Sequence, residues 1–302
     1  MSIKVAGAPI SWGVWDDRSE VPGIHVLDDI AACGYAGTEL GPPGYFGDAA
    51  ELRSALAQRS LSLVGAFLPL PYSKPELAAR NLADAEASLD MLESSSPDGT
   101  LPRIVLSDAY QEPDRIALAG RIADHPEAWL DEAGWEALLA NVGEISRRCR
   151  ERGFEVAFHP HGGSYIETPE EIDRLMAGTD PETVGLCIDT GHAFFGGGDP
   201  LDLMRRHGDR LRLVHLKDVD LDVLAELKRD GYGIEEAWKR GIFCELGAGG
   251  VDLDGFLGLI EERGYDGWIV VEQDRVLEGA DALARAHESE ARNRDFLRRR
   301  GI

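Results

Sequence analysis

Eight short apolar runs, separated by longer amphipathic stretches, are the feature of this sequence that most constrains its fold. Each run is only a few residues long and rich in β-forming side chains, as is typical of strands buried on both faces. The runs lie near residues 5, 37, 65, 105, 156, 186, 214 and 271. Strands that alternate with helices predict a parallel sheet, and eight of them close into a barrel. We therefore predict an α/β fold, a (β/α)8 TIM barrel forming a single domain over residues 1–302.

The segments between the runs have the patterns of helices. Several of them end in a glycine that an aromatic residue follows, as in CGYAG, RGFEV and RGYDGW. Glycine just beyond a helix, followed at once by a strand, is the expected signal of a helix-to-strand turn. An open, doubly wound sheet is the competing fold. The chain has no GxGxxG after its first strand and no phosphate-binding P-loop, so the nucleotide-binding version of that fold lacks support.

Two longer segments interrupt the alternation, at residues 109–133 and 219–250. In a barrel, both belong to loops that follow strands, on the face where active sites lie. We expect these insertions to shape a substrate pocket; the alternative is that they elaborate the surface or form a subunit contact.

Composition excludes several classes of partner. The net charge of −24 argues against binding to nucleic acids or anionic membranes, which require a basic surface. The four cysteines form no CxxC pair, so neither a zinc knuckle nor a disulfide framework is expected. The sequence shows no secretory signal and no apolar run near the ~20 residues that span a bilayer. Reduced thiols and a cytoplasmic location follow as expectations.

Side chains that bind hard metals gather at the ends of the last four predicted strands. Apolar strands that end in a buried carboxylate or imidazole carry a desolvation cost, which a bound cation offsets. In a barrel these strand ends converge on one mouth. Mixed carboxylate and imidazole ligands suit Mn²⁺, Co²⁺, Fe²⁺ or Zn²⁺ better than Ca²⁺. In strand order, the residues are His159, His161 and Glu167; Asp189 and His192; His215, Lys217 and Asp218; Glu272 and Asp274.

Each of these residues also has an ordinary structural explanation. A single strand histidine is more often a core or capping residue than a ligand. Asp189 can cap the loop that follows it, and Glu167 can lie beside a helix N-terminus, where the helix dipole favours it. The hypothesis of a metal site depends on the coincidence at four consecutive strand ends.

Taken together, the motifs resemble those of the xylose isomerase-like TIM barrels, a superfamily of sugar isomerases, epimerases and related enzymes. The resemblance covers essentially the whole chain and is closest to the inosose (2-keto-myo-inositol) dehydratase branch. The motifs that carry it are APISWG, TELG, HPHGGSYIETPEEID, CIDTGH, VHLKD, ELGAGGVD and YDGWIVVEQD.

This resemblance implies one divalent metal ion, Mn²⁺ or Co²⁺ first and Mg²⁺, Fe²⁺ or Zn²⁺ as alternatives. The family holds it with Glu, Asp, His and Glu from the last four strands, and Asp189, His215 and Glu272 match three of these positions. The fifth-strand Glu is replaced here by His159-Pro160-His161. Either His159 or Glu167 supplies the missing ligand. We prefer Glu167, because two carboxylates offset the charge of a dication better than one.

The resemblance also implies a lyase or isomerase that acts on a keto-polyol or sugar through an enediolate. The first expectation is dehydration of an inosose to a cyclic dione and water. A ketose 3-epimerase or sugar isomerase, including one acting on a keto-glycoside, is the alternative, and a non-catalytic metal-binding barrel is the third. Glu272, with Glu167 or His159 across the site, is the candidate acid–base pair. Lys217 can donate to the enolate oxygen or the leaving hydroxyl, or simply form an ion pair.

Substrate contacts are expected around the mouth of the barrel. Aromatic faces cover the apolar face of a sugar ring, and carboxylates bind its hydroxyls. We expect a small polyol or sugar as the partner, no nucleic acid and no membrane, and leave a homo-oligomer open. The predicted substrate-binding residues are Trp12, Trp15, Glu39, His161, His192, Lys217 and Arg275.

Overall fold

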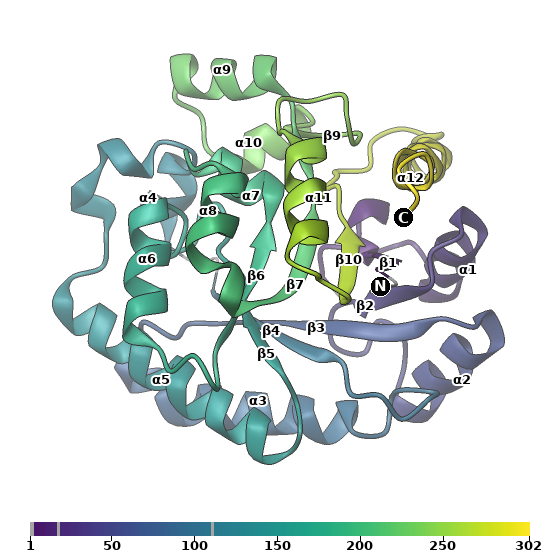
Figure 1. Cartoon of the computed structure of the whole chain (residues 1–302), viewed down its shortest axis with the longest axis horizontal. Helices are drawn as coiled ribbons and strands as arrows, with labels where there is room; N and C mark the ends of the chain where they lie inside the picture. The colour runs from purple at the N-terminus through teal and green to yellow at the C-terminus, as the bar shows by residue number, and fades with distance from the viewer. Residues whose placement is uncertain (1–2, 17–18, 110–111) are drawn as a thin grey trace.

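A computed structural model of the chain, which describes residues 3–16, 19–109 and 112–302, contains a closed barrel of eight parallel strands (Figure 1). The strands follow one another around the barrel in the order β1-β10-β7-β6-β5-β4-β3-β2. They are β1 (Lys4–Gly7), β2 (Gly37–Leu40), β3 (Ser62–Leu70), β4 (Arg103–Asp108), β5 (Val156–Phe158), β6 (Gly185–Asp189), β7 (Leu211–Leu216) and β10 (Trp268–Val271). The predicted (β/α)8 fold is confirmed, and each predicted run corresponds to one barrel strand.

Helices surround the barrel, as expected of a fold in which each strand must be covered (Figure 1). The long helices are α1 (Gly23–Cys33), α2 (Ala49–Arg59), α3 (Ala78–Leu92), α5 (Glu132–Glu151), α6 (Pro169–Gly178), α8 (Pro200–His207), α11 (Leu253–Glu262) and α12 (Ala282–Arg298). Short 3-10 helices are η1 (Pro9–Trp12), η2 (Pro75–Leu77), η3 (Ile122–Asp124), η4 (Pro126–Ala128) and η5 (Gly208–Arg210). No described helix is long and apolar enough to cross a membrane.

Glycine ends the helices as the sequence pattern predicts. Gly34, Gly153 and Gly264 all have positive φ angles, of 84°, 88° and 72°. This left-handed conformation costs glycine little, because it has no Cβ. The chain can therefore leave the helix abruptly and enter the next strand.

The interior of the barrel is built in layers, because alternate residues of each strand point inward. A small apolar cluster fills the barrel, and a second, larger cluster joins the outer face of the strands to the helices. The inner cluster contains Ala6, Ala8, Val64, Val105, Ala157, Cys187, Leu213 and Val270. Side chains two residues further along these strands point inward at the next level, toward the C-terminal mouth.

That next level is polar, and it contains the predicted metal ligands. Two residues beyond Ala157, Cys187, Leu213 and Val270, the chain places His159, Asp189, His215 and Glu272. The same step from Val105 on β4 leads to Ser107. The period of the strands thus brings together four residues that are far apart in the sequence.

The two insertions carry additional elements on the mouth side of the barrel. The first, between β4 and α5, contains α4 (Pro113–Leu118), η3 and η4, and its residues 110–111 lie outside the described residues. The second, between β7 and α11, contains β8 (Asp218–Val219), α9 (Leu221–Asp230), α10 (Ile234–Lys239) and β9 (Phe243–Cys244). The two insertions meet, since α10 packs against α4.

A buried ion pair holds the first insertion to the barrel. Arg115 of α4 contacts Glu171 of α6 through Nη1 and Oε1 (2.9 Å), and its Nε donates to the carbonyl of Ser164 (2.7 Å). Both charged side chains are buried. Burying two charges is costly unless their hydrogen bonds are complete, so this arrangement fixes α4 against the loop that follows β5.

The glycine-rich segment ELGAGG closes around Asp218 and not around a ligand. The Asp218 carboxylate accepts hydrogen bonds from the backbone amides of Gly247 (2.8 Å), Gly249 (3.0 Å) and Val251 (3.0 Å). A Cβ atom on Gly249 would collide with this carboxylate and with the carbonyl of Val219. The close backbone approach that the glycines indicate is therefore structural.

We expect Gly249→Ala to lower the free energy of unfolding by about 2 kcal/mol, because the added methyl group displaces the Asp218 carboxylate from its amide donors. Gly258→Ala is the matched control, since its Cβ meets no atom within 4 Å and it lies in helix α11. That variant should be unchanged or gain up to about 1 kcal/mol. Urea unfolding measures both; equal stabilities of the two variants would contradict this role of Gly249.

Candidate metal centre and substrate cavity

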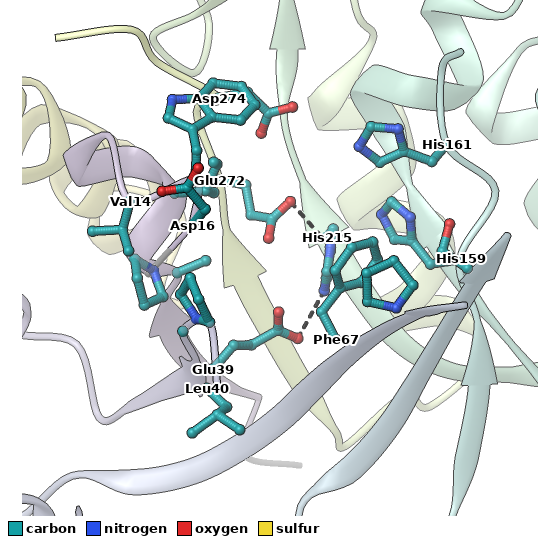
Figure 2. Close-up of a pocket in the computed structure, with 18 of the residues that line it drawn as sticks. Val14, Asp16, Glu39, Leu40, Phe67, His159, His161, His215, Glu272 and Asp274 are labelled. Atoms are coloured by element: carbon teal, nitrogen blue, oxygen red, sulfur yellow. Dashed lines mark hydrogen bonds and ion pairs between the residues drawn. The ribbon is translucent and has the colours of Figure 1, made fainter. Parts of the chain in front are cut away.

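Four buried side chains from four neighbouring strands converge at the mouth of the barrel. His159, Asp189, His215 and Glu272 each offer one ligand atom, and these atoms all lie within 4.8 Å of one another. We call these four residues the lower group. Figure 2 shows His159, His215 and Glu272 facing the same space, together with Glu39. This set of two imidazoles and two carboxylates is of the kind that binds transition metals.

Distances within the lower group are those of groups that need a shared cation. Nδ1 of His215 lies 3.1 Å from Oε2 of Glu272 and 3.9 Å from Oδ2 of Asp189. The same Asp189 oxygen lies 3.3 Å from Nε2 of His159. Oxygen and nitrogen lone pairs at these separations repel one another unless a proton or a metal ion lies between them.

Glu39 determines which nitrogen of His215 faces the lower group. Its Oε1 lies 2.9 Å from Nε2 of His215, so this nitrogen carries the proton and donates it to the carboxylate (Figure 2). The other nitrogen, Nδ1, is buried and makes no hydrogen bond within the described part of the chain. A buried lone pair that points between two carboxylates fits a metal ligand, and the residues present therefore suit a divalent ion.

The pKa shifts in the lower group follow from the close contact of its acidic and basic side chains. Burial alone would raise the pKa of Asp189, but Lys217 and the neighbouring histidines hold it well below its usual range. Burial likewise opposes ionisation of Glu272, and His215 and Lys217 outweigh it and lower that pKa. For His215, the nearby Cys187, Glu272 and Glu39 outweigh burial and raise its pKa well above the ordinary value, so that without a metal ion Nδ1 also holds a proton, which a bound ion would displace to use the lone pair. Both carboxylates of the group are thus ionised.

A second polar level lies directly above the lower group. The step of two residues along β5, β7 and β10 leads from His159 to His161, from His215 to Lys217 and from Glu272 to Asp274. Lys217 is the centre of this level. Its Nζ lies 2.8 Å from Asp274 Oδ1, 3.1 Å from Glu272 Oε2 and 3.2 Å from Asp189 Oδ2. One buried ammonium group therefore links the two levels.

Burial opposes the charge of Lys217, but these three carboxylates outweigh it and raise the pKa of its ammonium group. The predicted ion-pair alternative for Lys217 is thus present with Asp274. Lys217 also lines the cavity described below.

His192 contacts residues of this second level from the side away from the cavity. Its Nδ1 accepts a hydrogen bond from the amide of Gly162 (3.2 Å), so the proton is on Nε2, which faces Asp274 Oδ2 at 3.4 Å. The ring stacks on His161 with centroids 3.9 Å apart. His192 thus positions His161 and Asp274, and it does not line the cavity itself. The prediction of a direct substrate contact by His192 does not agree with this geometry.

The structure does not bring Glu167 to the lower group. Its carboxylate accepts hydrogen bonds from the amides of Gly120 (2.8 Å) and Gly163 (2.6 Å), one on each oxygen. Burial raises its pKa to about 7, against the lowering effects of Arg115 and these amides. The preference for Glu167 as the fifth-strand ligand and base is therefore corrected. The loop after β5 turns the side chain toward the first insertion, and His159, not Glu167, lies in the lower group.

A cavity of about 580 Å³ opens above the lower group. Its walls include the predicted residues Trp15, Glu39, His159, His161, His215, Lys217 and Glu272. Figure 2 shows Val14 and Asp16 on one side of the cavity and Phe67 and His159 on the other. Trp15 is 38% exposed and packs on Trp238 with ring centroids 4.5 Å apart. A polyol bound here would meet ionised groups below and aromatic faces above.

Trp12 and Arg275 do not reach this cavity. Trp12 is fully buried in the core between the barrel and the helices, where its Nε1 donates to Asp29 Oδ2 (3.2 Å). The side chain of Arg275 contacts Gln273, and its backbone carbonyl accepts the Nε1–H of Trp15 (2.9 Å). Both are corrections to the predicted substrate contacts; Arg275 instead supports Trp15.

Several cavity residues lie outside the predicted set: Asp16, Phe67, Ser107, Asp108 and Trp238. Ser107 and Asp108 had a detectable signal, since both lie at the end of a predicted strand. Trp238 had none, because it belongs to α10 in the second insertion and reaches the cavity only through tertiary packing. The expectation that this insertion shapes the pocket agrees with the position of Trp238.

Comparison with known proteins agrees with this architecture. Residues 27–299 match the family described as the xylose isomerase-like TIM barrel. The chain belongs to this family. Inosose dehydratase from Geobacillus kaustophilus is 33% identical over 279 residues, which are 90% of this chain and 87% of that protein. The rhizopine catabolism protein MocC from Rhizobium meliloti is 37% identical over 300 residues, or 97% of this chain and 89% of that protein.

A solved structure shows the same fold at low sequence identity. The IolI protein, crystallised with a bound zinc atom, superposes with a TM-score of 0.71 at 14% identity. The match covers 98% of this chain and 96% of IolI. The expected family and fold are thus confirmed.

We expect Asp189→Ala to abolish binding of a divalent ion, whereas Glu167→Ala should retain one ion per chain. The reason is that Asp189 lies in the lower group and the Glu167 carboxylate is held by two backbone amides away from it. Metal content after dialysis, measured by mass spectrometry, tests both variants, with circular dichroism as the check of folding. If Glu167→Ala lost the metal ion and Asp189→Ala retained it, the ligand would be Glu167 and not Asp189, and this account of the site would be contradicted.

Proposed function

We propose that this xylose isomerase-like barrel is a divalent-metal-dependent inosose dehydratase, which converts 2-keto-myo-inositol to a cyclic dione and water. The observation that carries the proposal is the convergence of the lower group with the Lys217 ammonium group at the floor of one cavity. The relative from Geobacillus kaustophilus, 33% identical, is an inosose dehydratase. The cavity walls are hydroxyl-binding and aromatic, as a keto-polyol requires.

His159, Asp189, His215 and Glu272 would hold the ion, with Mn²⁺ or Co²⁺ as the first candidates. A divalent ion bound there polarises a ketone and stabilises the negative charge that develops on its oxygen. Glu39 keeps His215 in the required tautomer through its hydrogen bond to Nε2.

Glu272 is the proposed base that removes the proton alpha to the ketone. Its carboxylate is ionised and lines the cavity, and Lys217 and His215 orient its Oε2. The electron pair of the broken C–H bond then forms the carbon–carbon double bond of an enol. Glu167 lies outside the cavity. The acid that acts together with the base Glu272 therefore comes from the second polar level, which lies above the lower group.

Lys217 is the proposed acid for the departing hydroxyl. As the β-carbon–oxygen bond breaks, its ammonium group donates a proton, and the hydroxyl leaves as water. The ketone re-forms, and the hydroxyl on the new carbon–carbon double bond tautomerises to the second carbonyl of the dione. Asp274, 2.8 Å from Nζ, holds the ammonium group in position. His161 and Glu39 line the cavity beside the site and are placed to bind the remaining hydroxyls of the ring.

We also propose that the protein acts in the cytoplasm on a small polyol, without a nucleic-acid or membrane partner. The four cysteines are free, as a reducing compartment favours. A homo-oligomer stays a prediction, which a measurement of the oligomeric state in solution would test.

The proposal predicts that metal-loaded protein converts 2-keto-myo-inositol to a dione and that a chelator abolishes the reaction. Mass spectrometry of the product measures water loss, and turnover in deuterium oxide measures proton removal at the α-carbon. Restored activity on adding Mn²⁺ or Co²⁺ completes the test. Deuterium uptake without water loss would instead indicate an epimerase or isomerase.

We expect Lys217→Met to lose dehydration by at least about a hundredfold while it still exchanges the α-proton with solvent, because the base Glu272 is retained, still held by His215, and the acid for the leaving group is lost. Metal content and circular dichroism verify that the site and fold persist. Equal losses of exchange and of dehydration would assign Lys217 to proton removal and contradict its role as the acid.

A further inference from the structure

The cavity is larger than one keto-polyol ring requires. A water molecule takes up about 30 Å³ of liquid, so a cavity of about 580 Å³ has room for roughly twenty of them. A single inosose, with six carbons and six oxygens joined by covalent bonds, fills at most about half of this space. The remainder is available to another part of the substrate.

The four residues of the lower group occupy only one half of the barrel circumference. They come from the consecutive strands β5, β6, β7 and β10. The other half consists of β1, β2, β3 and β4, and in the strand order β4 lies opposite β10 and β3 lies opposite β7. Phe67 of β3 and Ser107 of β4 therefore line the wall that faces Glu272 and His215 across the cavity.

Ser107 has an unmet hydrogen-bonding requirement on that wall. Its Oγ is buried and has no hydrogen-bond partner among the described residues, although the residue lines the cavity. A buried hydroxyl without a partner is costly and indicates a site for a polar ligand. Asp108 follows it and also lines the cavity, so this wall can bind more than one substrate hydroxyl.

Aromatic side chains flank the outer part of the cavity. The ring centroid of Phe67 lies 6.3 Å from that of His161, and the centroid of Trp238 lies 6.4 Å from the same His161 ring. Trp15 extends the Trp238 surface, and Phe67 is 40% exposed. Exposed aromatic faces at a cavity mouth are suited to the apolar face of a sugar ring.

We propose that the outer part of the cavity, formed by Trp15, Phe67 and Trp238 above the wall of Ser107 and Asp108, is a second subsite for a sugar or polyol ring linked to the keto-polyol ring. This inference rests on the proposed function, because it assumes that the ketone lies at the lower group. The natural substrate is then a glycosylated inosose or a related two-ring ketone. The first ring reacts at the floor, and the second ring binds between the aromatic side chains.

The test compares two substrates of the metal-loaded protein: 2-keto-myo-inositol, and the same ketone with a glucosyl group on the carbon across the ring from the carbonyl. We expect kcat/KM to be at least about tenfold higher for the glucosylated ketone. Trp238→Ala should remove this preference, because it should lower kcat/KM for the glucosylated ketone at least about tenfold more than it lowers kcat/KM for the free ketone. Phe67→Ala should act in the same direction, and its exposed side chain can be truncated without opening the core.

Leu221→Ala is the matched control, because Leu221 belongs to the same insertion as Trp238, is 52% exposed and does not line the cavity. It should leave the preference intact. Equal kcat/KM values for the two ketones in the wild-type protein, or equal losses for both in Trp238→Ala and Phe67→Ala, would overturn the second subsite.

Calorimetric binding of both ketones separates this inference from the proposed function. If neither ketone is dehydrated, but the glucosylated one binds about tenfold more tightly and loses this advantage in Trp238→Ala, the subsite stands and the dehydratase proposal fails. If both are dehydrated with equal kcat/KM and equal affinity, the dehydratase proposal stands and the subsite fails.

Discussion

Two ionised carboxylates and two imidazoles, buried within a few ångströms of one another, are the arrangement on which the rest of this site depends. Such a group is stable only if positive charge is present among its members. Lys217 supplies part of that charge, at 3.2 Å from Asp189 and 3.1 Å from Glu272. The hydrogen bond from His215 to Glu39 leaves Nδ1 as a lone pair directed at the same place. The chemistry proposed for the cavity above follows from the cation that these groups require.

The barrel brings the group together through its simplest property, the inward alternation of residues along each strand. A floor of small and branched apolar residues leaves no room for a ligand inside the lower barrel. The four residues of the lower group lie two residues beyond this floor along their strands. Two residues further along the chain lie Lys217, Asp274 and His161. Substrate can therefore enter only from the mouth, where the second insertion supplies Trp238. The barrel provides the reactive floor, while the insertions determine how much of the substrate is covered.

Strand alternation was sufficient to predict the fold, and the strand ends placed Asp189, His215 and Glu272 among the candidate ligands. The choice of these three came from the resemblance to the xylose isomerase-like barrels. The choice between His159 and Glu167 was wrong, because it depends on the Gly120 amide, a tertiary contact that spacing along the chain does not reveal. The two tryptophans of SWGVW diverge for a local reason. Gly13 adopts a φ of 71°, which turns Trp12 into the core and lets Trp15 reach the cavity. Phe67 and Trp238 escaped prediction because neither lies at a strand end.

Anomalous diffraction from crystals of the metal-loaded protein tests the central claim most directly. We predict one strong peak per chain, located among the side chains of His159, Asp189, His215 and Glu272. A peak beside Glu167, a peak between His161, His192 and Asp274, or no ordered ion at full metal loading would contradict the account.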